Sequence, residues 1–303
     1  MLRGVLPDDV LDDVARAVDG EVTVVGRLAG GANGGVVRVR VAGRPDAVLK
    51  TTPRTGSHQL AEALRARRVV EHMRARGYPT PAWLGVGATP THVWQLVDHV
   101  DAQPATRLTP SLVEQLVTIN ELQAGQAGEP PDHWTYAWRV VTGREPVGAA
   151  CTGHSPAAAG LVSRAQAAGA ALEPPVAAPD MVHADLNPGN VLTRDGDVVA
   201  LVDIGNAGRG TRATDLVTLL WHTFDEPLDD VRARLWTTVL QLVGAEWAAG
   251  LAATQALLQL EWRIGLARDR ATGATGATEA AEAAVTAVID RGHRVLDELD
   301  ARR

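Results

Sequence analysis

The stretch "MVHADLNPGNVL", residues 181–192, carries the strongest signal in the sequence, because it places three polar side chains in one loop after an apolar run. His183 ends the apolar run, Asp185 follows two residues later, and Asn190 follows five residues after Asp185. Pro and Gly between the last two predict a tight turn. This spacing presents a carboxylate and an amide from one short loop.

A second carboxylate arrives thirteen residues after Asn190, at Asp203 in "LVDIGN". The intervening segment alternates apolar and polar residues on both sides of "DGD", a pattern that predicts a β-hairpin. A hairpin returns the chain to the end where it began, so Asp203 should lie close to Asn190. Phosphoryl transfer needs such a set: one Asp orients the attacking hydroxyl, while an Asn and another Asp hold the Mg²⁺ that bridges the ATP phosphates. The alternative, a polar turn with an incidental helix cap, accounts for single residues but not for the full spacing.

These residues resemble the aminoglycoside phosphotransferase family of the protein-kinase-like superfamily, whose loop runs His-Gly-Asp-Leu-His-Pro-Gly-Asn. The chain has "HADLNPGN" there, with departures at Ala184 and Asn187. Ala184 is expected to be a minor change if the backbone is not left-handed at that position. Asn187 is expected to alter contacts with the phosphates or the substrate. "VDIG" stands where protein kinases have Asp-Phe-Gly, and Ile204 agrees with family members outside the protein kinases.

The resemblance implies an α+β, two-lobed fold with a small antiparallel-sheet N-lobe that carries one helix and a larger, mainly helical C-lobe. The expected division is 1–98 for the nucleotide-binding lobe, 99–104 for the hinge and 105–303 for the lobe with the catalytic loop, metal site and acceptor pocket. The implied roles are catalytic base for Asp185, metal ligands for Asn190 and Asp203, and structural support for His183 and Asp215.

The sequence pattern supports this division independently. A first amphipathic helix ends near Gly20, and β-branched strands at 21–28, 35–42 and 47–52 predict a three-strand antiparallel meander. A helix at 57–76 and two more strands at 82–88 and 92–98 complete the small sheet domain. Later segments are rich in Ala and Leu and predict helices near 110–126, 157–172, 211–224, 228–243, 247–269 and 278–300.

Lys50, in "VLKTT" at 48–52, is the only lysine among 29 basic residues. It lies on the third predicted strand, where the superfamily keeps the lysine that grips the α and β phosphates of ATP. An ammonium group acts as a compact point charge, whereas a guanidinium group is larger and planar. Glu62, on the following helix, is the expected carboxylate partner in preference to Glu71, and the alternative for Glu62 is an intrahelical pair with Arg65.

The turn "LAGGANGGVV", residues 28–37, is expected to cover the phosphates through Gly30, Gly31, Asn33, Gly34 and Gly35, although a flexible turn explains it equally well. A Walker loop is excluded because Leu49 occupies the position before the lysine that requires Gly. The linking segment 95–101 is expected to bind the adenine edge through its backbone from Asp98 to Val100. A plain linker is the alternative, and both can hold.

The acceptor region has weaker signals. Trp134 and Trp138 share a face if their segment is helical, and they could stack on a sugar or a base, but packing beneath helices is the stronger interpretation. "DEPLDD" offers Asp225 and Glu226 to a polyamine, yet it also suits ordinary helix capping. Glu261 is a third candidate.

Composition excludes other classes. A formal net charge of -7 and a pI near 5.7 argue against a nucleic-acid partner, and the arginines at 65–76 fit a solvated helix face. The lone Cys151 forms no internal disulfide, and the acidic N-terminal region and the lack of a long apolar run favour a cytoplasmic protein without a membrane partner.

The resulting hypothesis is an O-phosphotransferase that uses ATP, or another nucleoside triphosphate such as GTP, with Mg²⁺ and phosphorylates a hydroxyl of a small molecule, first of all an antibiotic. The alternatives are a metabolite kinase of the same fold, acting on choline, a sugar or homoserine, and a catalytically silent nucleotide-binding scaffold. The complete set of Lys50, Asp185, Asn190 and Asp203 argues against the scaffold. No Ala-Pro-Glu motif follows Asp203, so nothing indicates a protein kinase.

Overall fold

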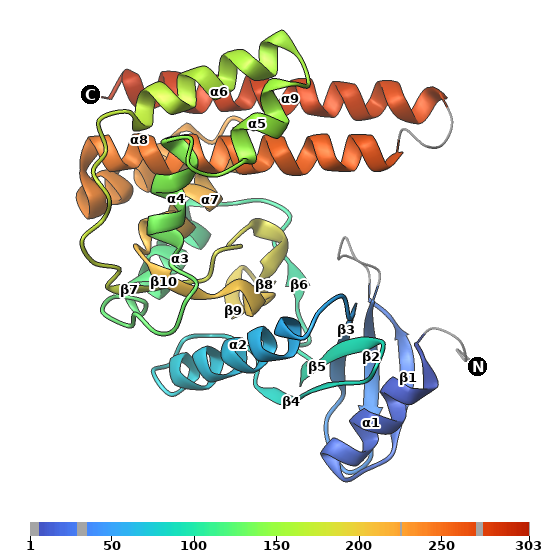
Figure 1. Ribbon diagram of the computed structural model, residues 1–303. Coiled ribbons are helices and arrows are strands. Elements are labelled where there is room, and N and C mark those ends of the chain that lie inside the picture. Colours follow the sequence, from blue (N-terminus) through green and yellow to red (C-terminus); the bar gives the residue numbers. More distant parts are fainter. Residues whose placement is uncertain (1–5, 29–34, 225, 271–274, 303) are drawn as a thin grey trace. The chain divides into compact units, whose positions relative to one another are not determined.

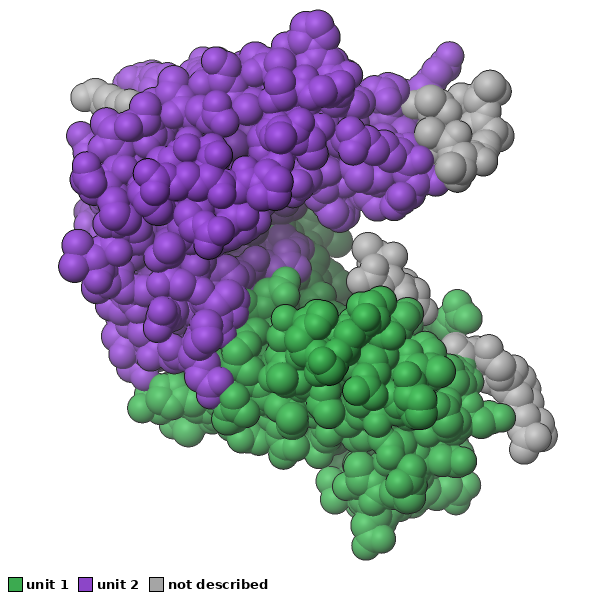
Figure 2. All heavy atoms as spheres, in the orientation of Figure 1, with its two compact units in different colours: residues 1–107, 188–207 green, residues 108–187, 208–303 purple. Residues whose placement is uncertain are grey.

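The computed structural model describes residues 6–28, 35–224, 226–270 and 275–302 (Figure 1). The chain divides into two compact units (Figure 2): residues 1–107 with 188–207 form unit 1, and residues 108–187 with 208–303 form unit 2. Unit 1 holds an antiparallel sheet and unit 2 is mainly helical, which confirms the predicted fold class. The predicted boundaries at 98 and 105 stay a prediction.

The sheet of unit 1 has five strands in the order β1-β2-β3-β5-β4, all antiparallel to their neighbours. The first three strands form the predicted meander, because their alternating β-branched residues suit a sheet with one buried face. The bounds are β1 Val22–Arg27, β2 Val36–Val41, β3 Ala47–Pro53, β4 Trp83–Ala88 and β5 His92–Asp98.

Helix α1 (Asp8–Val18) covers one face of this sheet. Its side chains at Val10, Val14 and Val18 are buried in a cluster with alternate residues of the strands, among them Leu49 and Leu96. Burial of each such aliphatic side chain contributes roughly 1.5–3 kcal/mol. Successive strand residues point to opposite faces, so the covering of this face by α1 leaves Lys50 on the other one.

The rest of unit 1 comprises helix α2 (His58–Arg74) and the hairpin predicted between Asn190 and Asp203. The hairpin consists of β8 (Val191–Arg194) and β9 (Asp197–Leu201), flanked by the short 3₁₀ turns η1 (Pro188–Asn190) and η2 (Ile204–Asn206), and β8 also pairs with β6 (Gln103–Pro104). Asp195 and Gly196 both have positive φ, 55° and 89°, as a tight two-residue hairpin turn requires. The Leu201 amide donates to the Pro79 carbonyl at 2.6 Å and ties the hairpin to the segment after α2.

Unit 2 is built around the long helix α8 (Asp229–Arg270), which contacts the other helices of the unit and lies beside α9 in Figure 1. Gly244, with φ 72° and ψ 172°, interrupts α8 inside the gap predicted between 243 and 247. The other elements are α3 Pro110–Glu121, α4 His133–Val141, α5 Val147–Thr152, α6 Pro156–Gly169, β7 Asp180–Val182, β10 Gly208–Gly210, α7 Ala213–Trp221 and α9 Thr275–Asp300. Among the described residues, no helix has both the length and the apolar character that a membrane crossing needs.

Candidate active site

Lys50 lies in the middle of β3, where it pairs with Val36 of β2 and Gln95 of β5. Its ammonium group forms an ion pair with Asp203, the Nζ and Oδ1 atoms being 2.5 Å apart. The two side chains are 34% and 44% exposed, and both belong to unit 1. The lone lysine therefore meets one of the two predicted metal ligands, 153 residues away in the sequence.

Asp203 follows β9 with a left-handed backbone, φ 59° and ψ 40°. The amide of the preceding Val202 donates to the Asn190 carbonyl at 2.9 Å, so the hairpin brings the main chain of its two ends together as predicted. Among the described residues, no cluster of three or more His, Cys, Asp or Glu side chains suits a metal ion. Mg²⁺, however, binds through one or two carboxylates plus water and substrate phosphates. A carboxylate and an amide oxygen fit that requirement.

Glu62 is exposed on α2, and Lys50 is paired with Asp203 instead. Arg65, the other expected partner of Glu62, donates to the carbonyls of Gly205 and Ala207 and thereby links α2 to the segment after Asp203. Glu71 pairs with Arg67 at 2.8 Å. A contact of Glu62 with Lys50 in the nucleotide-bound state stays a prediction.

The expected phosphate-covering residues Gly30, Gly31, Asn33 and Gly34 lie outside the described residues. Gly35 is described, and its carbonyl accepts from the Thr51 amide at 2.9 Å. A Cβ atom at position 35 would lie 2.5 Å from the Thr51 carbonyl oxygen. The strand after the turn therefore approaches β3 too closely for any residue except glycine.

Two of the three amides in the expected adenine-binding segment, residues 98–100, are already hydrogen-bonded. The Asp98 amide donates to Ala82 at 2.9 Å, and the His99 amide donates to Asp46 at 3.1 Å. The Val100 carbonyl accepts from Ala102 at 3.0 Å. No hydrogen bond from the Val100 amide is found within the described ranges, so this amide is the better donor for a base edge. The adenine-binding role of this segment stays a prediction.

The expected catalytic loop, residues 183–187 of unit 2, is held through its backbone. The buried Asp215 of α7 accepts from the amides of His183, at 2.8 Å, and Ala184, at 2.9 Å. The imidazole of the fully buried His183 lies 3.3 Å from the Asp185 amide. The support expected from His183 and Asp215 thus has a concrete form, a set of hydrogen bonds to loop amides.

Ala184 differs from the expectation. Its φ is 68°, in the left-handed region, where a Cβ atom is disfavoured and glycine is at ease. The condition under which Ala for Gly would be a minor change is therefore not met. Alanine in this position carries a conformational cost that the surrounding contacts must offset.

Asn187 gains a definite partner. Its side-chain amide donates to Oδ1 of Asp185 at 2.9 Å, and its backbone amide donates to the Asp185 carbonyl at 3.0 Å. The residue that replaces the family histidine therefore acts on the expected catalytic base. Sequence reasoning assigned its effect to the phosphates or the substrate because spacing alone does not reveal where a turn side chain folds back.

The candidate acceptor residues are dispersed. Helix α4 places Trp134 edge-on to Trp247, with ring centroids 5.2 Å apart, and the Trp138 indole donates to the Leu172 carbonyl at 2.9 Å. Arg144 covers the Trp138 ring at 4.3 Å. Both tryptophans thus take part in packing within unit 2, as the stronger interpretation held.

The acidic candidates lie in two different settings, and Asp225 is outside the described residues. Glu226 lines an open pocket of about 610 Å³ together with Phe224, Pro227, Arg232, Arg294, Asp297 and Glu298. Glu261, on α8, acts elsewhere: burial, and after it the charge of Glu261, raises the pKa of Tyr136 on α4. Glu261 is not among the residues that line the pocket beside Glu226.

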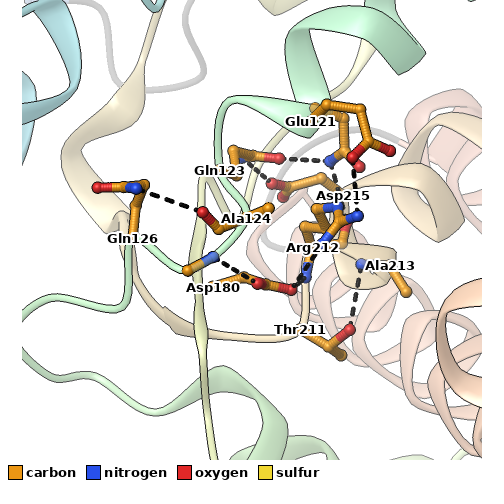
Figure 3. A network of polar contacts seen from close by, with 11 residues as sticks. Glu121, Gln123, Ala124, Gln126, Asp180, Thr211, Arg212, Ala213 and Asp215 are labelled. Carbon is orange, nitrogen blue, oxygen red and sulfur yellow. Dashed lines mark hydrogen bonds and ion pairs between the residues drawn. The ribbon is translucent and has the colours of Figure 1, made fainter. Parts of the chain in front are cut away.

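Sequence reasoning missed a polar cluster behind the catalytic loop, shown in Figure 3. Gln123, at the end of α3, donates to Asp215, and Asp180 accepts from the amides of Gly125 and Arg212. Arg212 also forms an ion pair with Glu121 at 2.9 Å. No sequence signal pointed to Gln123, Asp180, Arg212 or Glu121, since each one is an ordinary polar residue at or beside the end of a helix or strand.

Comparisons with known proteins agree with this geometry. A model of the phosphotransferase enzyme family (APH) matches residues 24–257. A search of curated proteins finds no match. Among solved structures, a thermostable mutant of aminoglycoside phosphotransferase APH(4)-Ia, in a ternary complex with ADP and hygromycin B, has a TM-score of 0.66 at 14% identity, with 94% of this chain and 99% of that chain covered.

Two further structures have the same fold. Macrolide 2'-phosphotransferase MphH from Brachybacterium faecium has a TM-score of 0.57 at 18% identity, covering 92% of this chain and 97% of that one. A putative fructosamine-3-kinase from Haemophilus somnus 129PT has a TM-score of 0.57 at 10% identity, covering 92% and 96%. At these identities the similarity establishes the fold alone. The family model spans most of the sequence, and the chain therefore belongs to the phosphotransferase enzyme family.

Proposed function

We propose that this phosphotransferase moves the γ-phosphoryl group of ATP, or of another nucleoside triphosphate such as GTP, to a hydroxyl group of a small molecule. The observation that carries the proposal is the 2.5 Å ion pair between Lys50 and Asp203. A chain with one lysine places it on a central strand, against a carboxylate at the end of a distant hairpin. ADP and AMP-PNP in the solved structures of similar fold support a nucleotide as the donor.

Lys50 supplies a positive charge to the phosphates, and Glu62 is its second proposed partner once a nucleotide is bound. Asn190 and Asp203 would hold Mg²⁺, which neutralises negative charge on the phosphates when it is bound. The Lys50–Asp203 pair is half-exposed, so a ligand can exchange partners with both groups at small cost in stability. The glycine-rich turn and the Val100 amide are the proposed contacts to the phosphates and to the base.

Asp185 is the proposed base. It accepts the proton of the acceptor hydroxyl as that oxygen forms its bond to phosphorus, and the bond from phosphorus to the bridging oxygen of the nucleoside diphosphate breaks. The Asn187 amide, bonded to Oδ1, fixes the rotation of the Asp185 carboxylate about its Cβ–Cγ bond. Fixing this rotation aims the second oxygen in one direction, which a base that must meet a single hydroxyl requires.

An antibiotic is the proposed acceptor. Support comes from solved structures of similar fold that contain hygromycin B or streptomycin, and from the macrolide enzyme. Glu226 and Glu261 are the proposed contacts to amino groups of such a molecule, since a carboxylate attracts an ammonium group. A metabolite kinase is the second candidate, and the fructosamine kinase of similar fold supports it.

A screen for magnesium-dependent nucleotide consumption tests the proposal. Aminoglycosides, macrolides, choline, homoserine and sugar amines would each be supplied with ATP and, separately, with GTP. We expect one antibiotic to raise consumption well above the rate without acceptor and to gain one phosphate by mass spectrometry. A metabolite as the best acceptor would establish the second candidate. If neither nucleotide binds the purified protein, the proposal is wrong.

A further inference from the structure

A buried hydrogen-bonded cluster connects helix α3 to the catalytic loop. Asn120 and Gln123 come from the end of α3, and Asp215 comes from the first turn of α7; their exposures are 2%, 0% and 0%. Figure 3 shows Gln123 pointing toward Asp215. Most buried polar groups in proteins are hydrogen-bonded, so the donors and acceptors of this cluster fix its geometry, although Oδ1 of Asn120 has no hydrogen-bond partner among the described residues.

The chemistry of the cluster fixes the orientation of Gln123. Asp215 accepts and cannot donate, so the Gln123 atom 2.7 Å from Oδ2 of Asp215 is its nitrogen. The carbonyl oxygen of Gln123 then faces Asn120, whose side-chain nitrogen donates to it and, at 3.1 Å, to the Arg212 carbonyl. Asn120 orients Gln123, and Gln123 in turn orients the carboxylate of Asp215.

The other contacts of Asp215 are on the loop itself. Its Oδ2 atom accepts from the His183 amide and its Oδ1 atom accepts from the Ala184 amide, at 2.8 and 2.9 Å. The two oxygens are thus used on successive amides, which is possible only in one rotation of the carboxylate. Oδ2 is shared with Gln123, so this donor from the turn after α3 holds that rotation.

Ala184, whose amide bonds to Asp215, also has an unfavourable backbone conformation. Ala184 has φ 68°, and the next residue is Asp185. Without the hydrogen bond to Asp215, nothing in the side chain of an alanine favours the left-handed conformation. A relaxed Ala184 would rotate the chain and carry Asp185 away from its position.

We propose that Gln123 is a positioning residue of this enzyme: through Asp215 it keeps Ala184 in the left-handed conformation and thereby fixes the direction of Asp185. The inference rests on the proposed function, in which Asp185 is the base. It concerns a residue in the turn after α3 that lies outside the proposed catalytic and metal-binding residues. It also couples two positions that share one carboxylate partner, position 123 through its side-chain amide and position 184 through its backbone amide.

The coupling is tested with a double-mutant cycle of Gln123→Met, Ala184→Gly and both together. Met keeps the volume of Gln and removes the donor to Asp215. We expect Gln123→Met to lower kcat about tenfold with the KM for nucleotide within about twofold. Glycine adopts φ 68° without strain, so the double variant should recover to within about threefold of Ala184→Gly. Thr254→Val, which removes a buried hydroxyl bonded to Ala137 and Gly250 in the same unit, is the matched control and should keep its activity.

A second readout does not depend on catalysis. Hydrogen exchange at the His183 and Ala184 amides should accelerate at least about tenfold in Gln123→Met and remain at the parent rate in Thr254→Val. If Gln123→Met fails to fold, Asn120→Leu takes its place with the same expected directions, since it removes the donor that orients Gln123 together with the bond to the Arg212 carbonyl. A parent enzyme without any transferase activity would contradict the proposed function. The exchange rates would still test whether Gln123 holds the bonds from Asp215 to the His183 and Ala184 amides. The inference would be overturned if Gln123→Met kept the parent's kcat and hydrogen-exchange rates. It would also be overturned if Gln123→Met lowered kcat by the same factor with Ala184 and with Ala184→Gly.

Discussion

The two parts of the candidate site are held by different means. In unit 2, the catalytic loop is fixed through backbone amides that donate to a fully buried carboxylate, Asp215. In unit 1, Lys50 and Asp203 meet through half-exposed side chains at the ends of rotatable stems. The first arrangement forms with the fold itself. The second can be opened by a ligand, because an exposed ion pair contributes only about 0–1 kcal/mol to stability.

This difference predicts which substitutions affect activity without affecting stability. A change at Lys50 or Asp203 removes charge from a binding surface and leaves the core untouched. A change at Asp215 or Gln123 removes a partner from buried donors, which costs about 1–3 kcal/mol for each group left unsatisfied. Activity and stability should therefore separate in unit 1 and fall together behind the loop in unit 2.

The largest effect is expected for Asp185→Asn. The amide cannot accept the hydroxyl proton, so kcat should fall by roughly 10² or more, within the 10² to 10⁴ typical of a positioned base. The loop is held by Asp215 and not by the Asp185 carboxylate, so the melting temperature and the Kd for nucleotide should stay close to the parent values. Equal turnover by the variant and the parent would remove Asp185 from the role of base.

The second-largest effect is expected at Lys50 in unit 1. Lys50→Arg should lower kcat/KM at least about 100-fold, equivalent to about 2.7 kcal/mol, because the planar guanidinium group misplaces the phosphates. Its melting temperature should be unchanged. Arg38→Lys, on the neighbouring strand β2 in an ion pair with Asp46, is the reciprocal control and should retain full activity.

A labelling experiment checks the same residue without mutation. A lysine-reactive adenosine analogue should modify the single ε-amine, and ATP should protect it. The lone thiol does not compete near neutral pH, because burial, and after it the charge of Glu261, raises the pKa of Cys151 to about 11. If Lys50→Arg keeps kcat/KM within about threefold of the parent, a residue other than Lys50 holds the phosphates.

The smallest effect concerns the metal ligands. Asp203→Ala and Asn190→Ala should each raise the magnesium concentration needed for half-maximal turnover several-fold, since each removes an oxygen ligand of a hard cation. Asp203→Ala also removes the ion-pair partner of Lys50, so its turnover should fall further than that of Asn190→Ala. Asp197→Ala, an exposed carboxylate on the same hairpin, is the control. A magnesium titration that matches the parent in both variants would contradict the metal assignment.

Much of the fold was predictable because its signals are local. Alternating β-branched residues marked the meander, and "DGD" marked the hairpin that carries Asp203. The pair β7–β10, with three residues in each strand, is too short to leave a periodic pattern, and the same holds for the six-residue helix α5. The pattern of tryptophans in α4 does not decide between a helix and an extended segment.

The details of the site were less predictable, for a physical reason. Spacing placed Lys50 on its strand, but its pairing with Asp203 is a tertiary contact that no local pattern encodes. The left-handed backbone of Ala184 is invisible in sequence, since alanine disfavours it and only the Asp215 contacts enforce it. Gln123 and Asn187 likewise acquire their roles from partners that the fold supplies.

The assignment of residues 188–207 to unit 1 has a consequence for biosynthesis. Residues 1–107 leave the ribosome first, yet the carbonyl of Pro79 and the guanidinium of Arg65 find their partners only at Leu201, Gly205 and Ala207. Domains fold as units during translation, the N-terminal one usually first. Here the N-terminal unit is completed only after about two thirds of the chain has emerged, so the nascent protein must keep an unfinished sheet domain in solution while α3 to α6 are being made.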